Sequence, residues 1–159
     1  MEKIAGFAQK RREHFAYLSS QLQELTDKII LPKACEDSNP SWFGYLITCK
    51  EEIDRNKVVN YLESHGVQTR MLFAGNLIKH PCFDEMRLTG TGYRQVGSLN
   101  VTNHIMNHSF WIGVYPGMTT EMMDYMDKEM GNIILSLDGR KCVNDNVRIK
   151  PDNSGSYDD

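Results

Sequence analysis

Three short segments of strand-forming residues, each followed by a helical segment, constrain the fold of this chain most strongly. The segments are Ser41–Cys49, Val67–Phe73 and Phe110–Tyr115, and their aromatic and β-branched residues favour β-strands. Ser41–Cys49 is apolar on both faces, so it is expected to be a covered or central strand. With the helices between them, the segments predict an α+β fold, a two-layer α/β sandwich. Its small sheet of about three main strands is packed by helices.

Apolar residues recur every three or four positions in the helical segments, which is the spacing of an amphipathic helix. A first helix is predicted over residues 2–26, with the basic run at 10–12 on its solvated face. A second helix is predicted to begin at the N-cap Asp54 and to end at Gly66. A last helix, with a threonine cap, is predicted over residues 119–137. The inward-facing residues of the first and last helices are expected to be Ile4, Phe7, Ala8, Phe15, Leu18, Leu22, Leu25, Met122, Met123, Met126, Met130, Ile133, Ile134 and Leu137.

The length of 159 residues predicts one domain of ordinary size. We expect this domain over residues 1–137 and a polar, poorly ordered tail over residues 138–159. Lys and Arg number 18 and Asp and Glu number 21, so the net charge of −3 argues against a nucleic-acid partner. With no apolar run of membrane-spanning length and no signal peptide, the sequence predicts a cytoplasmic protein without membrane association.

The strongest candidate for a binding site is the segment Gly66–Asn76, which reads GVQTRMLFAGN. Its strand carries Arg70 and runs into a turn at Gly75. An arginine with a fixed position beside a turn is suited to binding a carboxylate or a phosphate. The alternative is a strand arginine paired with a surface carboxylate. No general base or nucleophile is evident beside Arg70, which indicates part of a binding site and no catalytic residue.

Other candidate sites are weaker. His104 and His108 have the spacing of zinc ligands, but no glutamate stands between them as in H-E-x-x-H and no third ligand is evident, so a helix-surface role is favoured. Tyr93 and Arg94 lie in a glycine-flanked loop that suits either a phosphate contact or an ordinary surface loop. The four cysteines include no C-x-x-C pair, and Cys49 is expected in the core.

Several motifs together resemble one protein family: TRMLFAGN at 69–76, HP at 80–81, YR-x-VG at 93–97 and IMNHSFWIGVYPGMTTEMMDYM at 105–126. They resemble the C-terminal domain of the DegT/DnrJ/EryC/StrS family of vitamin-B6-dependent sugar aminotransferases and dehydratases. SWFGYLIT at 41–48 and FWIGVYPG at 110–117 are most similar to its CDP-4-keto-6-deoxyglucose 3-dehydrase branch, which serves lipopolysaccharide biosynthesis. The resemblance implies the small domain of an aspartate-aminotransferase-like (fold type I) enzyme.

The resemblance also implies that the catalytic domain of the parent enzyme is absent from this chain. Family members hold pyridoxal or pyridoxamine phosphate (PLP or PMP) in a large N-terminal domain, with the catalytic lysine or its replacing histidine, and in this branch also iron–sulfur cysteines. No segment of this chain matches that domain, so no catalytic, cofactor-binding or metal-binding residue is assigned, and no cofactor is expected to be bound. Matching positions carry over only substrate binding, for Arg70, Phe73 and Asn76.

The implied parent is a homodimer that removes the C3 hydroxyl of the nucleotide sugar CDP-4-keto-6-deoxyglucose. This chain alone is expected to be inactive and to bind a CDP-sugar weakly or undetectably, because about half of the pocket walls would be missing. One alternative is the same domain of a nucleotide-sugar aminotransferase, which would carry a catalytic lysine upstream. Another is a free-standing module that holds a nucleotide sugar or a protein through Arg70 and the Tyr93–Arg94 loop.

Overall fold

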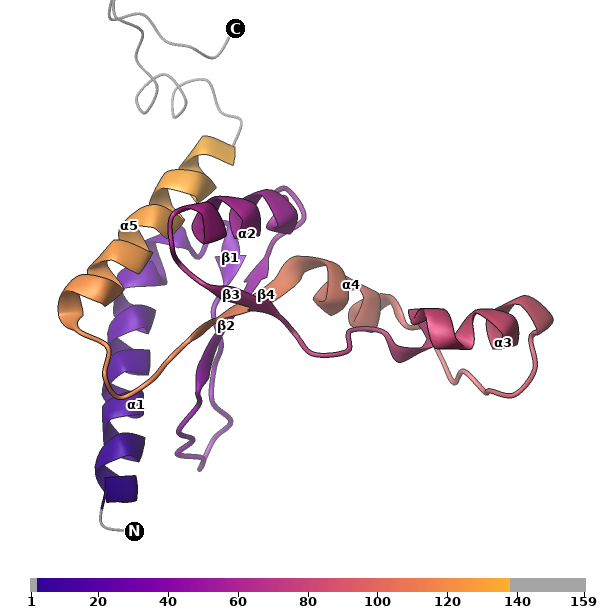
Figure 1. Ribbon diagram of the computed structural model, residues 1–159, viewed down its shortest axis with the longest axis horizontal. Coiled ribbons are helices and arrows are strands. Elements are labelled where there is room, and N and C mark those ends of the chain that lie inside the picture. The colour runs from indigo at the N-terminus through magenta and orange to yellow at the C-terminus, as the bar shows by residue number, and fades with distance from the viewer. Residues whose placement is uncertain (1–2, 138–159) are drawn as a thin grey trace, which may run out of the picture.

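A computed structural model describes residues 3–137 of the chain (Figure 1). The described residues form a four-stranded antiparallel sheet with helices on one face, which confirms the predicted α+β class. The elements in chain order are α1 (Lys3–Gln21), η1 (Leu22–Leu25), β1 (Ile29–Ile30), β2 (Gly44–Cys49), α2 (Arg55–Ser64), β3 (Thr69–Met71), η2 (Leu77–Lys79), η3 (Pro81–Phe83), α3 (Asp84–Thr89), α4 (Asn100–His108), β4 (Ser109–Gly113) and α5 (Thr120–Leu137).

The strand order in the sheet is β1-β2-β4-β3, and every neighbouring pair is antiparallel. Leu46 of β2 lies opposite Trp111 of β4, and Arg70 of β3 lies opposite Trp111 from the other side. Residues directly opposite each other in a sheet point to the same face. These three side chains therefore share one face of the sheet, across three adjacent strands.

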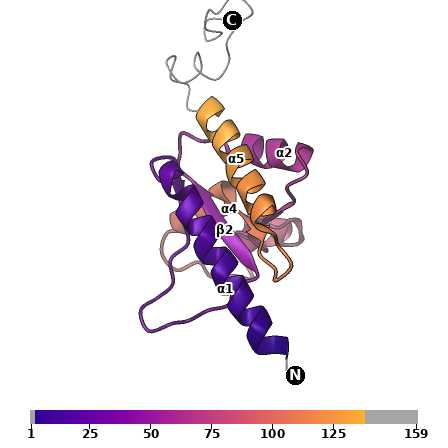
Figure 2. The ribbon, with the colours of Figure 1, turned by 90° about the vertical axis from the view of Figure 1, so that its left-hand side faces the viewer.

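The hydrophobic core lies between the other face of the sheet and helices α1, α2 and α5. Figure 2 shows α1 and α5 in front of β2, with α2 beside α5. Along β2 the residues alternate between buried and half-buried, which is the period of two expected of a strand with one covered face. The prediction that Ser41–Cys49 is a central strand is confirmed, but helices cover only one of its faces. The largest fully buried side chains are those of Tyr45, Phe110, Leu18, Leu22, Ile29, Ile47, Ile53, Leu62, Ile112, Met130, Ile134 and Val58.

The first helix is shorter than predicted, and its basic run is not simply solvated. Ile4 and Phe7 were expected to face inward but are 64% and 47% exposed, because the first turns of α1 extend past the end of the sheet (Figure 1). Arg11 and Arg12 are half-buried. Their guanidinium groups donate hydrogen bonds to backbone carbonyls of residues 39–41, in the loop that precedes β2. The assignment of these two arginines to a solvated face was wrong.

The second and last helices follow the sequence signals closely. The Asp54 carboxylate caps α2 by accepting hydrogen bonds from two backbone N–H groups, and Gly66 follows the helix with a φ of 79°. The Thr119 hydroxyl accepts a hydrogen bond from the Met122 N–H at the start of α5. Met122 itself, expected to face inward, is 41% exposed. A buried carboxylate that the sequence analysis did not single out, Glu129, lies instead in the inner stripe of α5.

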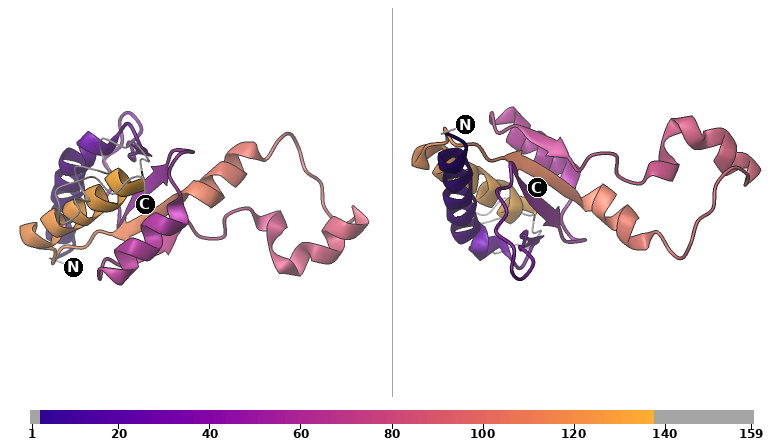
Figure 3. Two further views of the ribbon diagram at one scale, coloured as in Figure 1. Left: turned by 90° about the horizontal axis from the view of Figure 1, so that it is seen from above. Right: turned by 90° about the horizontal axis from the view of Figure 1, so that it is seen from below.

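Residues 77–108, which we call the arm, project away from the body of the molecule (Figures 1 and 3). The arm contains η2, η3, α3, the predicted glycine-rich loop and α4, and α4 runs directly into β4. Within the arm, Arg87 donates hydrogen bonds to the carbonyls of Ile78 and His80 and pairs with Asp84. These contacts give the arm a defined shape even though much of its apolar surface is exposed.

The predicted tail at residues 138–159 lies outside the described residues. Among the helices at residues 3–137, none has the length and apolar character that crossing a membrane requires.

Candidate functional site

The face of the sheet opposite helices α1, α2 and α5 carries a hollow of about 440 Å³, which we call the aromatic hollow. Its floor comes from β2 and β4, and its walls come from the loop before β2 and the residues after β3. This volume lies within the range of small-molecule sites, about 300–1,000 Å³. The lining residues are Pro32, Lys33, Trp42, Phe43, Gly44, Leu46, Leu72, Phe73 and Trp111.

The floor of the aromatic hollow depends on a missing side chain. A Cβ atom added to Gly44 would lie 2.6 Å from Trp111 Cε3, closer than a real Cβ contact allows. Gly44 therefore lets the indole ring of Trp111 lie close against β2. Phe43 packs edge-on against the same indole, with ring centroids 5.4 Å apart and an interplanar angle of 90°, a favourable geometry for two aromatic rings.

One wall of the hollow is held in place from helix α1. Trp42 packs against Phe15 of α1, with ring centroids 4.8 Å apart. Arg12 Nε and Nη2 donate to the carbonyls of Pro40 and Asn39 at 3.3 and 3.0 Å. Hydrogen bonds to a charged donor are stronger than neutral ones. The loop that carries Trp42 is thus attached to the helix layer by both aromatic packing and charge-assisted hydrogen bonds.

Phe73, one of the three predicted substrate-binding residues, lines the opposite wall of the hollow. Its backbone φ is 40°, an uncommon conformation for a bulky residue. This conformation ends the strand alternation, so that Leu72 and Phe73 both line the hollow. The Phe73 side chain is 78% exposed, so the fold gains little apolar burial from it.

Arg70, the second predicted residue, lies beside the aromatic hollow without lining it. It is exposed, and it shares the face of its register partner Trp111. Arg70 Nη1 donates to the carbonyl of the preceding residue, Thr69, at 2.9 Å. The nearby Glu63 carboxylate accepts hydrogen bonds from the Thr69 hydroxyl and N–H at 2.7 and 2.6 Å. These bonds lower the pKa of Glu63, and the charge of Arg70 lowers it further.

Asn76, the third predicted residue, is placed apart from the other two. It is 3% exposed, and its Nδ2 donates to Asn103 Oδ1 of α4 at 2.9 Å. The turn before it requires a glycine, since Gly75 has a φ of 61° and an added Cβ would lie 2.6 Å from Met106 Cγ. The hydrogen bond from Asn76 thus joins the segment that precedes the arm to helix α4. Arg70 and Phe73 lie instead on the open face of the sheet.

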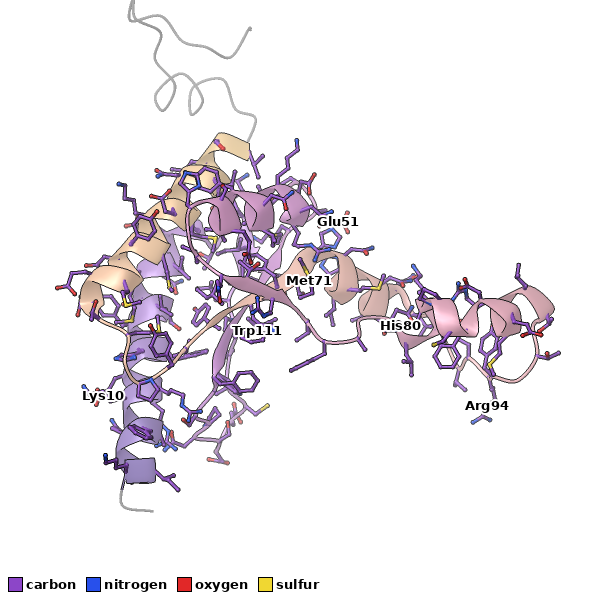
Figure 4. The ribbon with its side chains drawn as sticks, viewed as in Figure 1. Lys10, Glu51, Met71, His80, Arg94 and Trp111 are labelled. Carbon is purple, nitrogen blue, oxygen red and sulfur yellow. The ribbon has the colours of Figure 1, made fainter. Side chains whose placement is uncertain are left out.

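The weaker candidates lie elsewhere. Tyr93 and Arg94 are in the arm, and Figure 4 shows Arg94 near its tip, well away from Trp111 on the sheet. The imidazole rings of His104 and His108 stack with centroids 4.3 Å apart, and Glu51 Oε1 lies 3.9 Å from His104 Nδ1. Within residues 3–137, no group of three or more His, Cys, Asp or Glu side chains is arranged to hold a metal ion.

Most of the aromatic hollow was not predicted from the sequence. Of its lining residues, only Phe73 was among the residues predicted to bind substrate. The signal that could have found the hollow is the run Trp42-Phe43-Gly44, where a glycine between aromatic residues and a strand permits close approach of another ring. Cys49 is fully buried as predicted, and burial raises the pKa of its thiol to about 12.

The aromatic hollow lacks the residues with which enzymes usually hold PLP. PLP enzymes hold the cofactor through a lysine Schiff base, with an Asp or Arg partner at the pyridine nitrogen. The aromatic hollow has Lys33, but its nine lining residues include no carboxylate and no arginine. The residues that line the hollow therefore do not fit PLP, and no reaction step is assigned to a cofactor there.

Comparison with known proteins identifies the family. The sequence profile of the DegT/DnrJ/EryC1/StrS aminotransferase family matches residues 1–130. The chain belongs to this family. The family consists of PLP-dependent enzymes that include sugar dehydratases and aminotransferases, so the resemblance inferred from the motifs is confirmed.

Two curated proteins are similar in sequence to this chain. It is 45% identical over 128 residues to the lipopolysaccharide biosynthesis protein RfbH of Salmonella typhimurium, covering 79% of this chain. It is 36% identical over 136 residues, 84% of this chain, to a dTDP-4-dehydro-2,6-dideoxy-D-glucose 3-dehydratase of Saccharopolyspora spinosa. In both cases the chain spans only 28% of the relative's length.

The fold is shared with solved structures of the family. One of these is an E. coli GDP-4-keto-6-deoxy-D-mannose-3-dehydratase with bound hydrated PLP, which matches with a TM-score of 0.68 at 19% sequence identity. The match covers 81% of this chain and 32% of the dehydratase. At this identity the likeness establishes the fold, and it confirms that the sheet and its helices occur within PLP enzymes.

Proposed function

We propose that residues 1–137 are the substrate-closing C-terminal domain of a PLP- or PMP-dependent dehydratase. The enzyme would remove the C3 hydroxyl of CDP-4-keto-6-deoxyglucose in deoxysugar and lipopolysaccharide biosynthesis. Family membership supports this proposal, as does the identity to a lipopolysaccharide biosynthesis protein and to a sugar 3-dehydratase. The observation that carries the closing role is the open face of the sheet, where Arg70 and Phe73 flank an uncovered aromatic hollow.

In this proposal the chain positions the substrate and excludes water. Arg70 would donate to an anionic group, because a guanidinium binds phosphate or carboxylate oxygens in a fork geometry. Phe73 would contact the substrate from the wall of the hollow. Asn76 would accept a hydrogen bond from the substrate through its Oδ1, which accepts none from residues 3–137. Its Nδ2 would continue to donate to Asn103 Oδ1. Positioning of this kind can contribute several orders of magnitude to a rate.

The remainder of the parent would hold the cofactor. PLP or PMP would act as the electron sink of the reaction, and an iron–sulfur cluster would belong to that part as well. The parent would act as a homodimer, with the nucleotide sugar as its substrate, while this chain alone would be inactive.

A domain exchange tests the proposal. In RfbH, the segment aligned with this chain would be replaced by residues 1–137. Dehydration of CDP-4-keto-6-deoxyglucose would be measured first for intact RfbH and then for the chimera. We expect the chimera to retain the absorbance of bound cofactor and a measurable rate. Arg70→Ala in the chimera should lower kcat/KM about tenfold or more, whereas Arg94→Ala in the arm should leave it near the unsubstituted value.

A chimera that binds the cofactor but has no dehydratase activity would contradict the closing role. The same domain of a nucleotide-sugar aminotransferase is the second candidate, which the aminotransferase name of the matching family favours. A chimera built on an aminotransferase of the family would then be active where the RfbH chimera is not.

A further inference from the structure

We propose that the aromatic hollow binds the planar base of the nucleotide sugar, with Lys33 and Arg70 placed to meet the diphosphate. The inference rests on the proposed function, which makes a nucleotide sugar the ligand of this domain. It adds a binding site for one part of that ligand, formed by residues of this chain.

The chemistry of the hollow suits a flat, weakly polar ring. Four of its nine lining residues are aromatic, and no acidic side chain is among them. Nucleobases stack on exposed tryptophan and phenylalanine rings with little dependence on base sequence. Because Gly44 lets the Trp111 indole lie close against β2, this indole forms part of the floor on which such a ring could stack.

The backbone and exposure of Phe73 also indicate a ligand at the hollow. A bulky residue at a φ of 40° is held in a strained backbone conformation, and its ring is 78% exposed. Strain of this kind persists at sites where it serves a function. Since the ring gains little burial in the fold, the strained backbone is best explained by the presentation of Phe73 at the wall of the hollow, beside a ligand.

The charged side chains around the hollow favour a ligand that carries phosphate groups. Lys33 is exposed on the side of the hollow near β1, and Arg70 is exposed on the side near β3. Glu63 partly balances Arg70, but its carboxylate is already held by Thr69. The hollow thus has a cation on each side and no anion in its lining, an arrangement that favours a diphosphate attached to the bound base.

The chain offers a direct spectroscopic test. Its two tryptophans, Trp42 and Trp111, both line the hollow, so intrinsic tryptophan emission reports on this site alone. The full chain would be titrated with CDP, cytidine and ribose 5-phosphate, with N-acetyltryptophanamide correcting for absorption by the base. We expect saturable quenching by CDP with a Kd of about 1 mM, as suits half of a site. Cytidine should quench more weakly, and ribose 5-phosphate should not quench at all.

Variants separate the two parts of the site. Phe73→Ala should weaken the binding of both CDP and cytidine about fivefold. Arg70→Ala and Lys33→Ala should weaken the binding of CDP about tenfold and leave cytidine unchanged. Arg94→Ala, which removes an arm cation, is the matched control. dTDP and GDP in place of CDP would reveal whether the hollow distinguishes pyrimidine from purine bases, and weaker binding of GDP supports a fitted base site.

Two results would overturn the inference. One is binding of ribose 5-phosphate as strong as that of CDP, which would make the site a phosphate site. The other is the absence of any nucleotide-dependent quenching at 10 mM, about ten times the expected Kd, which would leave the hollow as a surface for another part of the parent. If the domain-exchange chimera is active and either of these two results is found, only the nucleotide-base site is refuted. If the chimera is inactive and CDP binds to the chain as expected, only the proposed function is refuted.

Discussion

Gly44 and Trp111 lie on neighbouring strands so close together that a single methyl group at Gly44 would overlap the indole ring, 2.6 Å from Cε3. The two residues are diagonal neighbours, because Gly44 is opposite Gly113 and Trp111 is opposite Leu46. This relationship sets the floor of the aromatic hollow and provides a sharp substitution experiment.

We predict that Gly44→Ala displaces the Trp111 indole and lowers the free energy of unfolding by about 1–3 kcal/mol, the usual range for an overpacked site. Urea unfolding and near-ultraviolet circular dichroism measure the two effects. Gly113→Ala is the matched control, since a Cβ at Gly113 meets no atom within 4 Å. If Gly44→Ala and Gly113→Ala had the same free energy of unfolding, the Trp111 indole would be free to move away from an added Cβ atom.

Arg12 is predicted to control the accessibility of Trp42. Arg12→Ala removes the hydrogen bonds to the carbonyls of Pro40 and Asn39, so the loop that carries Trp42 loses part of its attachment to α1. In the Trp111→Phe background, where Trp42 is the only tryptophan, acrylamide quenching should increase about twofold. Lys10→Ala, which removes only an exposed i,i+3 ion pair with Glu13, should leave quenching unchanged.

Tyr61 and Glu129 predict an acid-dependent contribution to stability. The Tyr61 hydroxyl donates to Glu129 Oε2 at 2.9 Å, and this bond is the main reason why the pKa of Glu129 lies below its ordinary value of 4.5. Because the folded-state pKa is lowered, the stabilisation is complete above the ordinary value and is lost as the pH falls through the folded pKa.

Tyr61→Phe should therefore lower stability at neutral pH and raise the pKa of Glu129. Urea unfolding between pH 3 and 7, covering about 1.5 pH units below and 2.5 above the ordinary pKa, and carboxyl carbon NMR measure the two changes. Tyr125→Phe is a suitable control, because its hydroxyl donates to the backbone carbonyl of His65 and to no carboxylate. If the pKa of Glu129 were the same in Tyr61→Phe, the hydroxyl would not be the group that lowers it.

Asp127 predicts the opposite dependence on pH. Burial raises the pKa of its carboxyl, and the charges of Glu24 and Asp124 raise it further. A raised folded-state pKa means that ionised Asp127 destabilises the fold, so this contribution improves as the pH falls through the folded pKa.

Asp127→Asn should consequently raise the Tm at pH 7. Asp124→Asn removes a charge from the same region but weakens the 2.6 Å hydrogen bond from the Tyr17 hydroxyl, so it should stabilise less or not at all. A lower Tm for Asp127→Asn, measured by differential scanning calorimetry, would refute the charge-repulsion explanation.

Local signals in the sequence predicted the layered core well. The Asp54 cap, Gly66 after α2 and the Thr119 cap each act within one helical turn, so their outcome depends little on the rest of the fold. The family motifs were equally informative, since they pointed to a fold and a family that the comparisons confirm.

The site was harder to predict because its parts are distant in the chain and depend on tertiary contacts. The reversal of φ at Phe73 has no glycine to announce it, and the hydrogen bonds from Arg12 to the loop at residues 39–40 span 27 and 28 positions. The spacing of apolar residues in α1 likewise could not reveal that Ile4 and Phe7 extend past the sheet. This spacing predicts which face of the helix is apolar, but it does not predict how far the sheet reaches along the helix.

The arm enters and leaves the sheet through the paired strands β3 and β4, where Met71 lies opposite Phe110. Met71 and Phe110, which precede and follow the arm, are therefore separated by one inter-strand spacing, about 5 Å. In topological terms the arm is an oversized hairpin loop. A hairpin loop can change without altering the strand pairing at its two ends, so substitutions within the arm should leave the hydrophobic core of the sheet intact.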